Sequence, residues 1–345
     1  MRTLTDLAER ARRTLDPVHW DYFAGGAGEE RTLLANTASF ERRRIVPRVL
    51  RSTGSRDLRT ALPGALSATP VLIAPTAFHR LAHPDGESGT ARAAAGTGTV
   101  LTVSMAATEP VERIAEAGGP LWFQFYPQPD RAFTAHVVRR AEKAGCRALV
   151  LTADSPVLGR RERDQRNRFH DLPAGLACEN MRDETGRVQP IAMDGTLGWE
   201  IVTWLRGVTG LPILVKGVLH PADATAAVEA GVDGLIVSNH GGRQLDGAVA
   251  TIDALPAVVR AVGRRVPVLL DGGVRRGADV LVALALGADA VLVGRPVLWG
   301  LAAGGAAGVR DVLDLLRADL DHVLALAGAR TPADLDPSMV VSAGC

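Results

Sequence analysis

The chain has 345 residues and a formal net charge of +1 at pH 7, with 47% hydrophobic and 22% charged residues. This length is enough for one large α/β barrel or two ordinary domains. The balanced charge argues against nucleic acid or an anionic membrane as a partner, and no apolar run is long enough to span a bilayer. Because Cys146, Cys178 and Cys345 are scattered and odd in number, neither a disulfide framework nor a metal site is indicated. With an N-terminus that lacks a signal-peptide core, these features predict a cytoplasmic protein.

In chain order, a helical lead-in over residues 1–70 is followed by short apolar strands that alternate with Ala-rich helical patterns. Eight strand–helix units predict a closed (β/α)8 barrel with its core over 71–300, in a single domain spanning 1–345. A doubly wound open sheet is the alternative, but the glycine-rich 25–28 has no strand before it. The predicted strands are 71–74, 100–103, 121–124, 148–151, 212–215, 235–237, 266–270 and 290–293, and the predicted helices include 132–144, 199–207, 222–230, 252–262, 278–286 and a C-terminal helix with its tail over 305–345.

A long polar stretch, 156–196, separates the fourth predicted strand from its helix. Loops of this length in barrels often close over the active site. We therefore expect this stretch to form a lid.

The most informative segment is 238–247, SNHGGRQLDG, which directly follows the strand 235–237. His240 can move a proton near neutral pH. Arg243, three residues later, can grip a carboxylate with a two-pronged hydrogen bond. The two glycines between them allow a sharp turn and the close approach of another molecule. The segment predicts proton chemistry on a small organic acid; a purely structural histidine is the weaker interpretation.

Polar residues follow all eight predicted strands, at the end where the active sites of such barrels lie. Any one of them alone would be interpreted as a turn residue, but together they indicate a binding site. After the seventh and eighth strands, glycines expose backbone N–H groups beside Arg275 and Arg295, which is typical of phosphate sites in this fold. Two ordinary glycine turns with surface arginines are the alternative. The strand-end residues are Thr76, Ser104, Gln124, Tyr126, Thr152, Asp154, Lys216, 238–243, 271–275, Gly294 and Arg295.

In these residues the chain resembles the FMN-dependent α-hydroxy acid oxidases and dehydrogenases, a family that includes glycolate oxidase, lactate oxidase and mandelate dehydrogenase. The resemblance extends over nearly the whole chain, and its most specific parts are 74–77, 158–161, 211–217, 238–247 and 271–276. It implies FMN as cofactor and oxidation of a 2-hydroxy acid to the 2-oxo acid. Because members of this family are often tetramers or octamers, it also implies a homotetramer or a larger assembly.

The resemblance implies a role for each matching residue. His240 would be the base, Asp154 would orient it, and Tyr126 would hydrogen-bond the substrate hydroxyl. Lys216 would lie near N1 and the C2 carbonyl of the flavin, where negative charge builds up on reduction. The substrate carboxylate would be bound by Tyr22, Arg161 and Arg243. The cofactor would be held by Pro75, Thr76, Ala77, Ser104, Gln124, Thr152, Lys216, Ser238, Asp271, Gly272, Gly273, Arg275, Gly294 and Arg295.

The substrate and the electron acceptor are less narrowly defined. Ala106 stands where glycolate oxidases carry a large aromatic residue, so a bulky acid such as (S)-mandelate or 4-hydroxymandelate is expected, and the whole chain resembles bacterial 4-hydroxymandelate oxidases. The lack of a haem-binding domain favours an oxidase that returns electrons to O2. The alternatives are a glycolate or L-lactate oxidase, a dehydrogenase with another acceptor, a related FMN barrel of the type 2 isopentenyl diphosphate isomerase kind, and a non-catalytic flavin-binding barrel.

Overall fold

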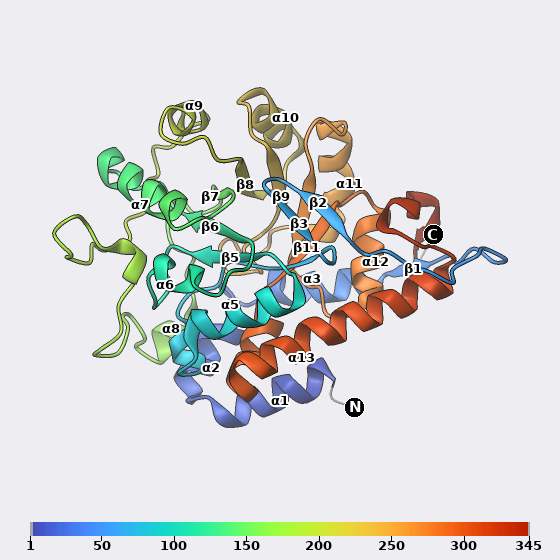
Figure 1. Cartoon of the computed structure of the whole chain (residues 1–345), viewed down its shortest axis with the longest axis horizontal. Helices are drawn as coiled ribbons and strands as arrows, with labels where there is room; N and C mark the ends of the chain where they lie inside the picture. Colours follow the sequence, from blue (N-terminus) through green and yellow to red (C-terminus); the bar gives the residue numbers. More distant parts are fainter. Residues whose placement is uncertain (1–2, 344–345) are drawn as a thin grey trace.

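A closed barrel of eight parallel strands occupies the centre of the computed structural model, which describes residues 3–343 (Figure 1). The strands follow one another around the barrel in chain order, and β11 pairs with β4 to close it. The predicted (β/α)8 barrel is confirmed, and each predicted strand corresponds to an observed one within a few residues. The barrel strands are β4 (Val71–Ile73), β5 (Leu101–Ser104), β6 (Leu121–Phe125), β7 (Leu149–Thr152), β8 (Ile213–Val218), β9 (Gly234–Val237), β10 (Val268–Asp271) and β11 (Ala290–Val293).

Helices surround the barrel because most of them bury one apolar stripe against the outer faces of the strands, whereas the short α8 buries no residue. The predicted helices lie within one residue of their observed bounds, apart from the C-terminal one. The helices after the strands are α4 (His79–Ala82), α5 (Gly86–Thr97), α6 (Val111–Ala115), α7 (Arg131–Lys143), α8 (Glu162–Arg166), α9 (Glu200–Arg206), α10 (Pro221–Glu229), α11 (Thr251–Val262), α12 (Gly277–Ala285) and α13 (Arg295–Ala327).

The inside of the barrel is a separate apolar cluster built from alternate residues of the strands, with Leu72 and Trp122 among its members. A hairpin of β2 (Thr60–Leu62) and β3 (Ala65–Ser67) covers one end of this cluster. Leu62 packs into the cluster, and the Trp122 indole donates to the Pro63 carbonyl at 3.1 Å. Since this end is closed by apolar packing, only the opposite end, where the strands terminate, is free for a site.

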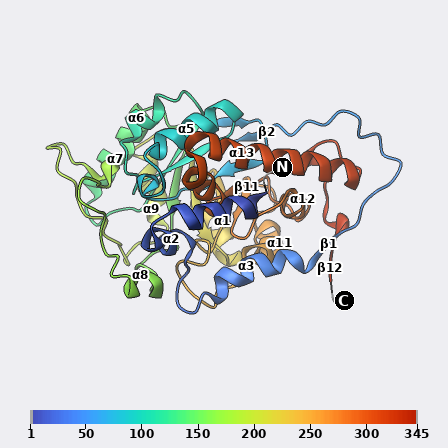
Figure 2. The same ribbon diagram turned by 90° about the horizontal axis from the view of Figure 1, so that it is seen from below.

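The prediction of a helical lead-in is correct only as far as residue 41. The helices α1 (Leu4–Thr14), α2 (Pro17–Ala24) and α3 (Arg31–Glu41) come first, and Figure 2 shows α1 beside α13 and α3 beside α11. After α3 the chain forms β1 (Arg43–Ile45), an extended segment and the β2–β3 hairpin. The extended part is stabilised by distant partners rather than by local periodicity, since Arg48 donates its backbone N–H to Ala327 and Asp57 donates to Arg330.

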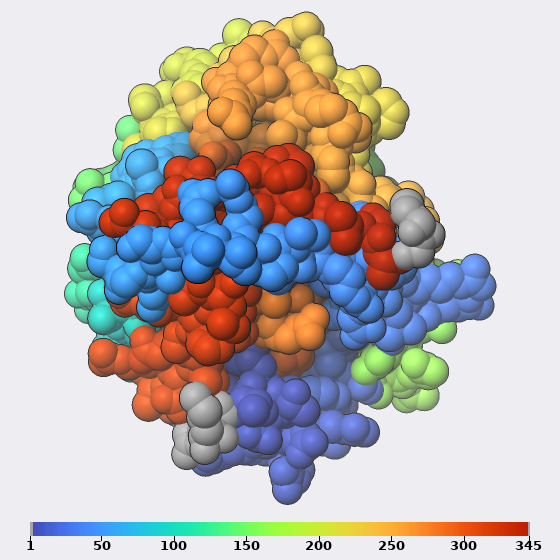
Figure 3. Space-filling model, turned by 90° about the vertical axis from the view of Figure 1, so that its right-hand side faces the viewer, coloured from blue at the N-terminus to red at the C-terminus, as the bar shows by residue number. Residues whose placement is uncertain are grey.

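The predicted C-terminal helix agrees with the second part of α13, because non-helical backbone at Gly304 and Gly305 divides α13 into two helices at that point. The predicted tail contains two short 3-10 turns and β12 (Val340–Ser342). Antiparallel pairing of β12 with β1 joins the two ends of the chain. In Figure 3 the light-blue early segment lies across the red C-terminal residues. Within 3–343, no helix has the length and apolarity needed to cross a bilayer.

Candidate active site

A cavity of about 1100 Å³ opens at the carboxyl ends of the strands, and the predicted site residues converge on it. All of them line the cavity except Asp154 and Ser238, which lie behind it and are hydrogen-bonded to His240 and Lys216, respectively. The lining residues are Tyr22, Pro75, Thr76, Ala77, Ser104, Ala106, Gln124, Tyr126, Thr152, Arg161, Lys216, His240, Arg243, Asp271, Gly272, Gly273, Arg275, Gly294 and Arg295.

His240 and Asp154 form the central pair of the site. The imidazole Nδ1 lies 2.8 Å from Asp154 Oδ1, so the carboxylate accepts the Nδ1 proton and leaves the Nε2 lone pair toward the cavity. Burial lowers the pKa of His240 below 6.5, although Asp154 opposes this shift. Burial by itself would raise the pKa of Asp154, but the charge and hydrogen bond of His240 lower it to about 2. The pair is therefore a neutral imidazole held by a carboxylate, which is the arrangement of a general base.

Tyr126 lies on the open side of His240. Its hydroxyl is 3.4 Å from His240 Nε2, and the two rings are nearly parallel, with an interplanar angle of 11°. Burial raises the pKa of Tyr126, so the phenol stays protonated and can donate a hydrogen bond. Nε2 and the phenol hydroxyl thus face the same space.

Two arginines and an aromatic ring form an anion site beside this pair. The guanidinium groups of Arg161 and Arg243 lie 5.9 Å and 5.0 Å from the ring centroid of Tyr22. Burial, followed by the charge of Arg161, lowers the pKa of Arg243 to about 10. The carboxylate of Asp164 is 3.8 Å from Arg161, and buried Arg161 Nε has no hydrogen-bond partner among the described residues. Positive charge exceeds negative charge here, so the site suits an added carboxylate.

Lys216, at the end of β8, is 3% exposed and connects two neighbouring strand ends. It donates to Ser238 Oγ at 2.8 Å and lies 3.2 Å from Asp271 Oδ2. Asp271 Oδ1 is buried and has no hydrogen-bond partner within the described part of the chain. Because a buried carboxylate oxygen normally accepts hydrogen bonds, this atom indicates that a donor is still to be bound.

The loops after β10 and β11 place glycines and arginines at the cavity wall. Gly272 and Gly273 have φ of 94° and 88°, and a Cβ on Gly273 would lie 2.2 Å from the Asn36 carbonyl, so only glycine fits. Burial lowers the pKa of Arg275 to about 10, and it lowers that of Arg295 further. Two buried arginines with lowered pKa values indicate an anion-binding region.

The two helix N-termini in this region differ. Asp279 already accepts the backbone N–H groups of Arg275 and Arg276, so the start of α12 is capped by the protein itself. The start of α13, after Gly294, has no side-chain cap hydrogen bond among the described residues. Gly294 and Arg295, which begin this helix, line the cavity, so this position suits a phosphate, although Pro296 has no backbone N–H and Val297 donates to the Gly294 carbonyl. Arg295 also donates to the carbonyls of Ala24, Gly25 and Gly241, so it binds the lead-in as well as lining the cavity.

The ends of β5, β6 and β7 are joined by a row of hydrogen bonds. Ser104 donates to Gln124 Oε1 at 3.2 Å, and Gln124 Nε2 donates to Thr152 Oγ1 at 3.0 Å. Because Oε1 accepts one of these hydrogen bonds and Nε2 donates the other, the Gln124 amide is held in a single orientation at the cavity. Thr76, after the neighbouring β4, also lines the cavity, and a Cβ added to Gly294 would make a tight contact of 3.2 Å with Thr76 Cγ2.

The sequence analysis missed several residues that support the site from behind. His79 is fully buried and contacts Thr76 Oγ1 at 2.7 Å and Thr90 Oγ1 at 2.9 Å. Asn36, in α3, makes two hydrogen bonds to Asn239, the residue before the base. Nothing in their own segments indicated these partners, because each contact joins elements that are distant in sequence or hidden behind the strand ends.

The predicted lid, 156–196, is attached at both ends. Near its start, Arg163 pairs with Glu30 at 2.6 Å and with Asp21 at 3.3 Å. Near its end, Asn180 accepts the Val111 N–H at 2.7 Å and donates to the Ser104 carbonyl at 3.1 Å.

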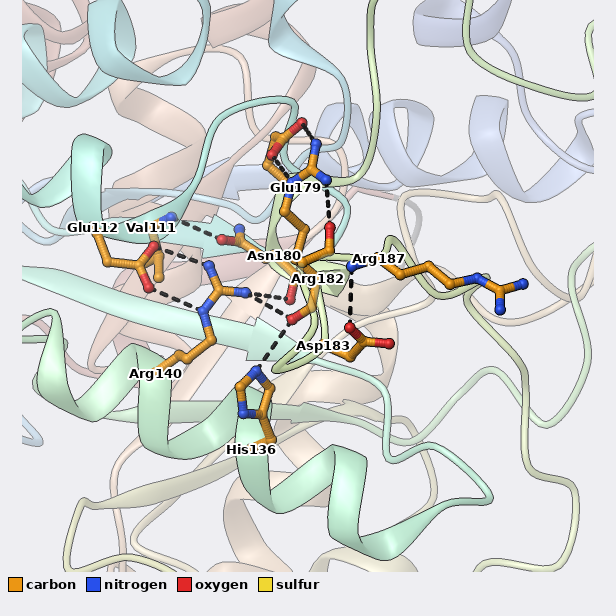
Figure 4. A network of polar contacts seen from close by, with 10 residues as sticks. Val111, Glu112, His136, Arg140, Glu179, Asn180, Arg182, Asp183 and Arg187 are labelled. Carbon is orange, nitrogen blue, oxygen red and sulfur yellow. Dashed lines mark hydrogen bonds and ion pairs between the residues drawn. The ribbon is translucent and has the colours of Figure 1, made fainter.

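A network around Asn180 joins the end of the lid to helices α6 and α7 (Figure 4). Arg140 pairs with Glu112 at 2.9 Å and donates to the carbonyls of Asn180 and Arg182, and His136 contacts the Arg182 carbonyl at 3.1 Å. The lid residues that follow, Val188, Ile191 and Met193, line the cavity. This half of the lid is therefore a fixed apolar wall rather than a loose flap.

No group of three or more His, Cys, Asp or Glu residues arranged to hold a metal ion is found within 3–343. A (β/α)8 barrel whose mouth combines a carboxylate-held histidine, paired arginines and a glycine–arginine loop belongs to the class of barrel enzymes suited to proton chemistry on a small carboxylic acid beside a phosphate-bearing group. The comparisons with known proteins narrow this class.

The model of the family described as FMN-dependent dehydrogenase matches residues 11–342, and the chain belongs to this family. It is 45% identical to an L-lactate oxidase of Nostoc sp. over 355 residues, covering 98% of this chain and 97% of the relative. It is 44% identical to 2-hydroxyacid oxidase 1 of Homo sapiens, covering 98% and 95%. The crystal structure of a mandelate oxidase with (S)-2-phenylpropionate superposes with a TM-score of 0.91 at 44% identity, covering 96% of each chain. FMN is the cofactor, and the reaction is oxidation of a 2-hydroxy acid.

The residues of the cavity fit FMN. The buried arginines Arg275 and Arg295 and the uncapped start of α13 lie together and suit its phosphate, and the free Asp271 Oδ1 suits a hydroxyl group of the ribityl chain. Lys216 is a buried cation among the lining residues, which would suit a ring that gains negative charge on reduction.

Proposed function

We propose that the protein oxidises an (S)-2-hydroxy acid with a bulky or aromatic side chain, such as mandelate or 4-hydroxymandelate, and uses O2 as the electron acceptor with release of H2O2. FMN supplies the electron-accepting ring. Two electrons and two protons leave the substrate, and the 2-oxo acid is the product. The observation that carries the proposal is the orientation of His240, with Nδ1 held by Asp154 and Nε2 facing the cavity next to Tyr126.

In this scheme His240 accepts one proton from the substrate at Nε2. The carboxylate of Asp154, 2.8 Å from Nδ1, stabilises the imidazolium that results. The low pKa of Asp154 keeps that carboxylate charged throughout the working pH range.

The substrate is positioned by its carboxylate. Arg161 and Arg243 lie on the face of the Tyr22 ring, and a carboxylate between them would offset the excess positive charge. Arg243 is already oriented by the carbonyls of Tyr22 and Gly25, at 2.7 Å and 2.8 Å, so little rotamer freedom is lost on binding. Tyr126 then donates to the substrate oxygen, and Lys216 stabilises negative charge on the ring.

The proposal of a bulky side chain is supported by the apolar part of the cavity lining. Ala106 contributes only a methyl group, and the lid adds the apolar side chains of Leu172, Leu176, Val188, Ile191 and Met193 to the same cavity. The same surface would exclude water around an aromatic ring. Glycolate or L-lactate is the second candidate, favoured by the names of the curated relatives.

An anaerobic absorbance experiment tests the proposal. The FMN-loaded protein is mixed with (S)-mandelate, 4-hydroxymandelate, L-lactate and glycolate in turn, and air is then admitted. We expect the flavin band to bleach fastest with the aromatic acids and to return in air with H2O2 release. A clear preference for glycolate would overturn the substrate proposal, failure to recover in air would identify a dehydrogenase, and no bleaching with any acid would identify a non-catalytic flavin-binding barrel.

We also propose a cytoplasmic homotetramer or larger assembly. The free thiols of Cys146 and Cys178 are typical of a reducing compartment. Exposed apolar side chains on two adjoining loops, Val157, Leu158 and Leu245, offer a surface for association. Light scattering after size exclusion tests the assembly, and a monomeric mass would contradict it.

A further inference from the structure

A pair of buried amides behind the active site connects the lead-in to the catalytic loop. Asn36 Nδ2 donates to Asn239 Oδ1 at 2.8 Å, and Asn239 Nδ2 donates to Asn36 Oδ1 at 2.8 Å. Both side chains are buried, with 2% and 4% exposure. They are separated by 203 residues in sequence, so the pair exists only through the tertiary fold.

The orientation of this amide pair is fixed by the backbone around Asn239. Its Oδ1 also accepts the Gly242 N–H at 3.1 Å, and its Nδ2 also donates to the Val249 carbonyl at 3.1 Å. Rotating the Asn239 amide by 180° would set donor against donor and acceptor against acceptor. Asn36 must therefore present a donor to Oδ1 and an acceptor to Nδ2.

The residues that Asn239 holds have an uncommon backbone conformation. His240 has φ of 59°, and Gly241 and Gly242 follow with 64° and 76°. A left-handed conformation is unfavourable for a non-glycine residue and persists only where the surroundings impose it. The hydrogen bond between Asn239 Oδ1 and the Gly242 N–H spans this turn.

Asn36 also contacts the glycine loop that follows β10. Its Oδ1 is 3.4 Å from the Thr251 N–H, and the Thr251 hydroxyl donates to the Gly272 carbonyl at 3.2 Å. The backbone carbonyl of Asn36 lies where a Cβ on Gly273 would be placed. One residue outside the barrel therefore touches both the turn that carries the base and the loop proposed to hold phosphate.

We propose that Asn36 is a positioning residue, which acts through Asn239 to hold the left-handed turn at His240 and so places Nε2 for proton transfer. This inference rests on the proposed function, because it assigns His240 as the base. The two can fail separately: bleaching of the unmodified protein by 2-hydroxy acids tests the function, and the Asn36 variants test the positioning.

The experiment compares Asn36→Asp and Asn36→Leu with Leu34→Ala, a control on the exposed face of the same helix. Asn36→Asp keeps the shape and the acceptor but sets an oxygen against Asn239 Oδ1; Asn36→Leu removes both hydrogen bonds. Flavin reduction by the best acid of the panel is measured anaerobically on the FMN-loaded fraction. Binding of phenylacetate, which carries the carboxylate but no hydroxyl, is measured separately.

We expect flavin reduction to slow by about 10²-fold in both Asn36 variants, since misplacing a base by about 1 Å has an effect of this size. The isotope effect with α-deuterated substrate should rise, while phenylacetate binding and Leu34→Ala remain as in the unmodified protein. A residue that only stabilises the fold would instead lower FMN content and thermal stability, with an unchanged reduction rate in the loaded fraction. That result, or full-speed reduction in a folded Asn36→Asp protein, would overturn the proposal. If Asn36→Leu does not fold, the near-isosteric Asn36→Asp decides.

Discussion

The ring of strand ends and the lid both border the cavity, but they are held in different ways. The strand ends are buried and joined to one another, as in the row from Ser104 through Gln124 to Thr152 and in the link from Lys216 to Asp271. The lid is tied near Arg163 and near Asn180, whereas the hydrogen bonds of 170–177 within the described chain are local and most of its side chains are partly or fully exposed. The comparison indicates that the catalytic and binding groups, which need accurate placement, lie on the barrel. The lid contributes the surface that selects the size of the substrate side chain.

The largest effect is expected when the base, His240, is removed from the ring of strand ends. His240→Asn should slow flavin reduction on the order of 10⁴-fold, because a positioned base contributes about 10²–10⁴ and the amide cannot accept the proton. Stopped-flow reduction without oxygen measures this rate. FMN content should stay unchanged, and a variant that is reduced at the normal rate would show that the base lies elsewhere.

A smaller loss with a distinctive pH profile is expected when the orienting carboxylate is neutralised. Asp154→Asn should slow reduction on the order of 10²-fold or more, because it removes the group that stabilises the imidazolium. Reduction requires neutral His240, so activity is lost as the pH falls through its pKa, which lies below 6.5. Asp154 raises that pKa, so its removal should shift the acid limb of kcat/KM to still lower pH. An acid limb that moves upward would contradict the assigned pairing.

The space available for the substrate side chain is tested by filling it at Ala106, which lines the cavity just after β5. Ala106→Phe should lower kcat/KM for mandelate relative to glycolate by about 10–100-fold, as expected for overfilling an apolar pocket. Both acids are measured on the same variant, so a general loss of activity cancels in the ratio. An unchanged ratio would place the substrate side chain against another surface.

The smallest effect is expected where the lid is anchored. Asn180→Ala should lower the free energy of unfolding by about 1–3 kcal/mol, since the buried Val111 N–H and Ser104 carbonyl lose their partner. Arg187→Ala is the matched control, because its side chain is exposed and points away from the network (Figure 4). Urea unfolding measures both. Equal stability of the two variants would mean that the anchor does not hold the lid.

The sequence predicted the elements that local periodicity defines, but not those that depend on contacts between segments distant in sequence. Alternation of short apolar strands with helical patterns predicted all eight strands, because each unit is defined by local periodicity. The prediction was wrong for 42–70, where β1 pairs with β12 at the other end of the chain and the β2–β3 hairpin packs against the barrel interior. These contacts leave no periodic signal in their own segment.

The same limit applies to the site. The residue types at the strand ends indicated acid–base chemistry and an anion site, since parallel strands of a barrel terminate at one face. The sequence by itself thus determined the fold class and the set of groups at the cavity. The pairing of Asp154 with His240 was already implied by the family resemblance, and the structure adds their distance of 2.8 Å. Only the tertiary structure revealed the support of Thr76 by His79 and the amide pair that connects Asn36 to the base. Hydrogen bonds between distant segments depend on how the chain packs, and local sequence does not encode that packing.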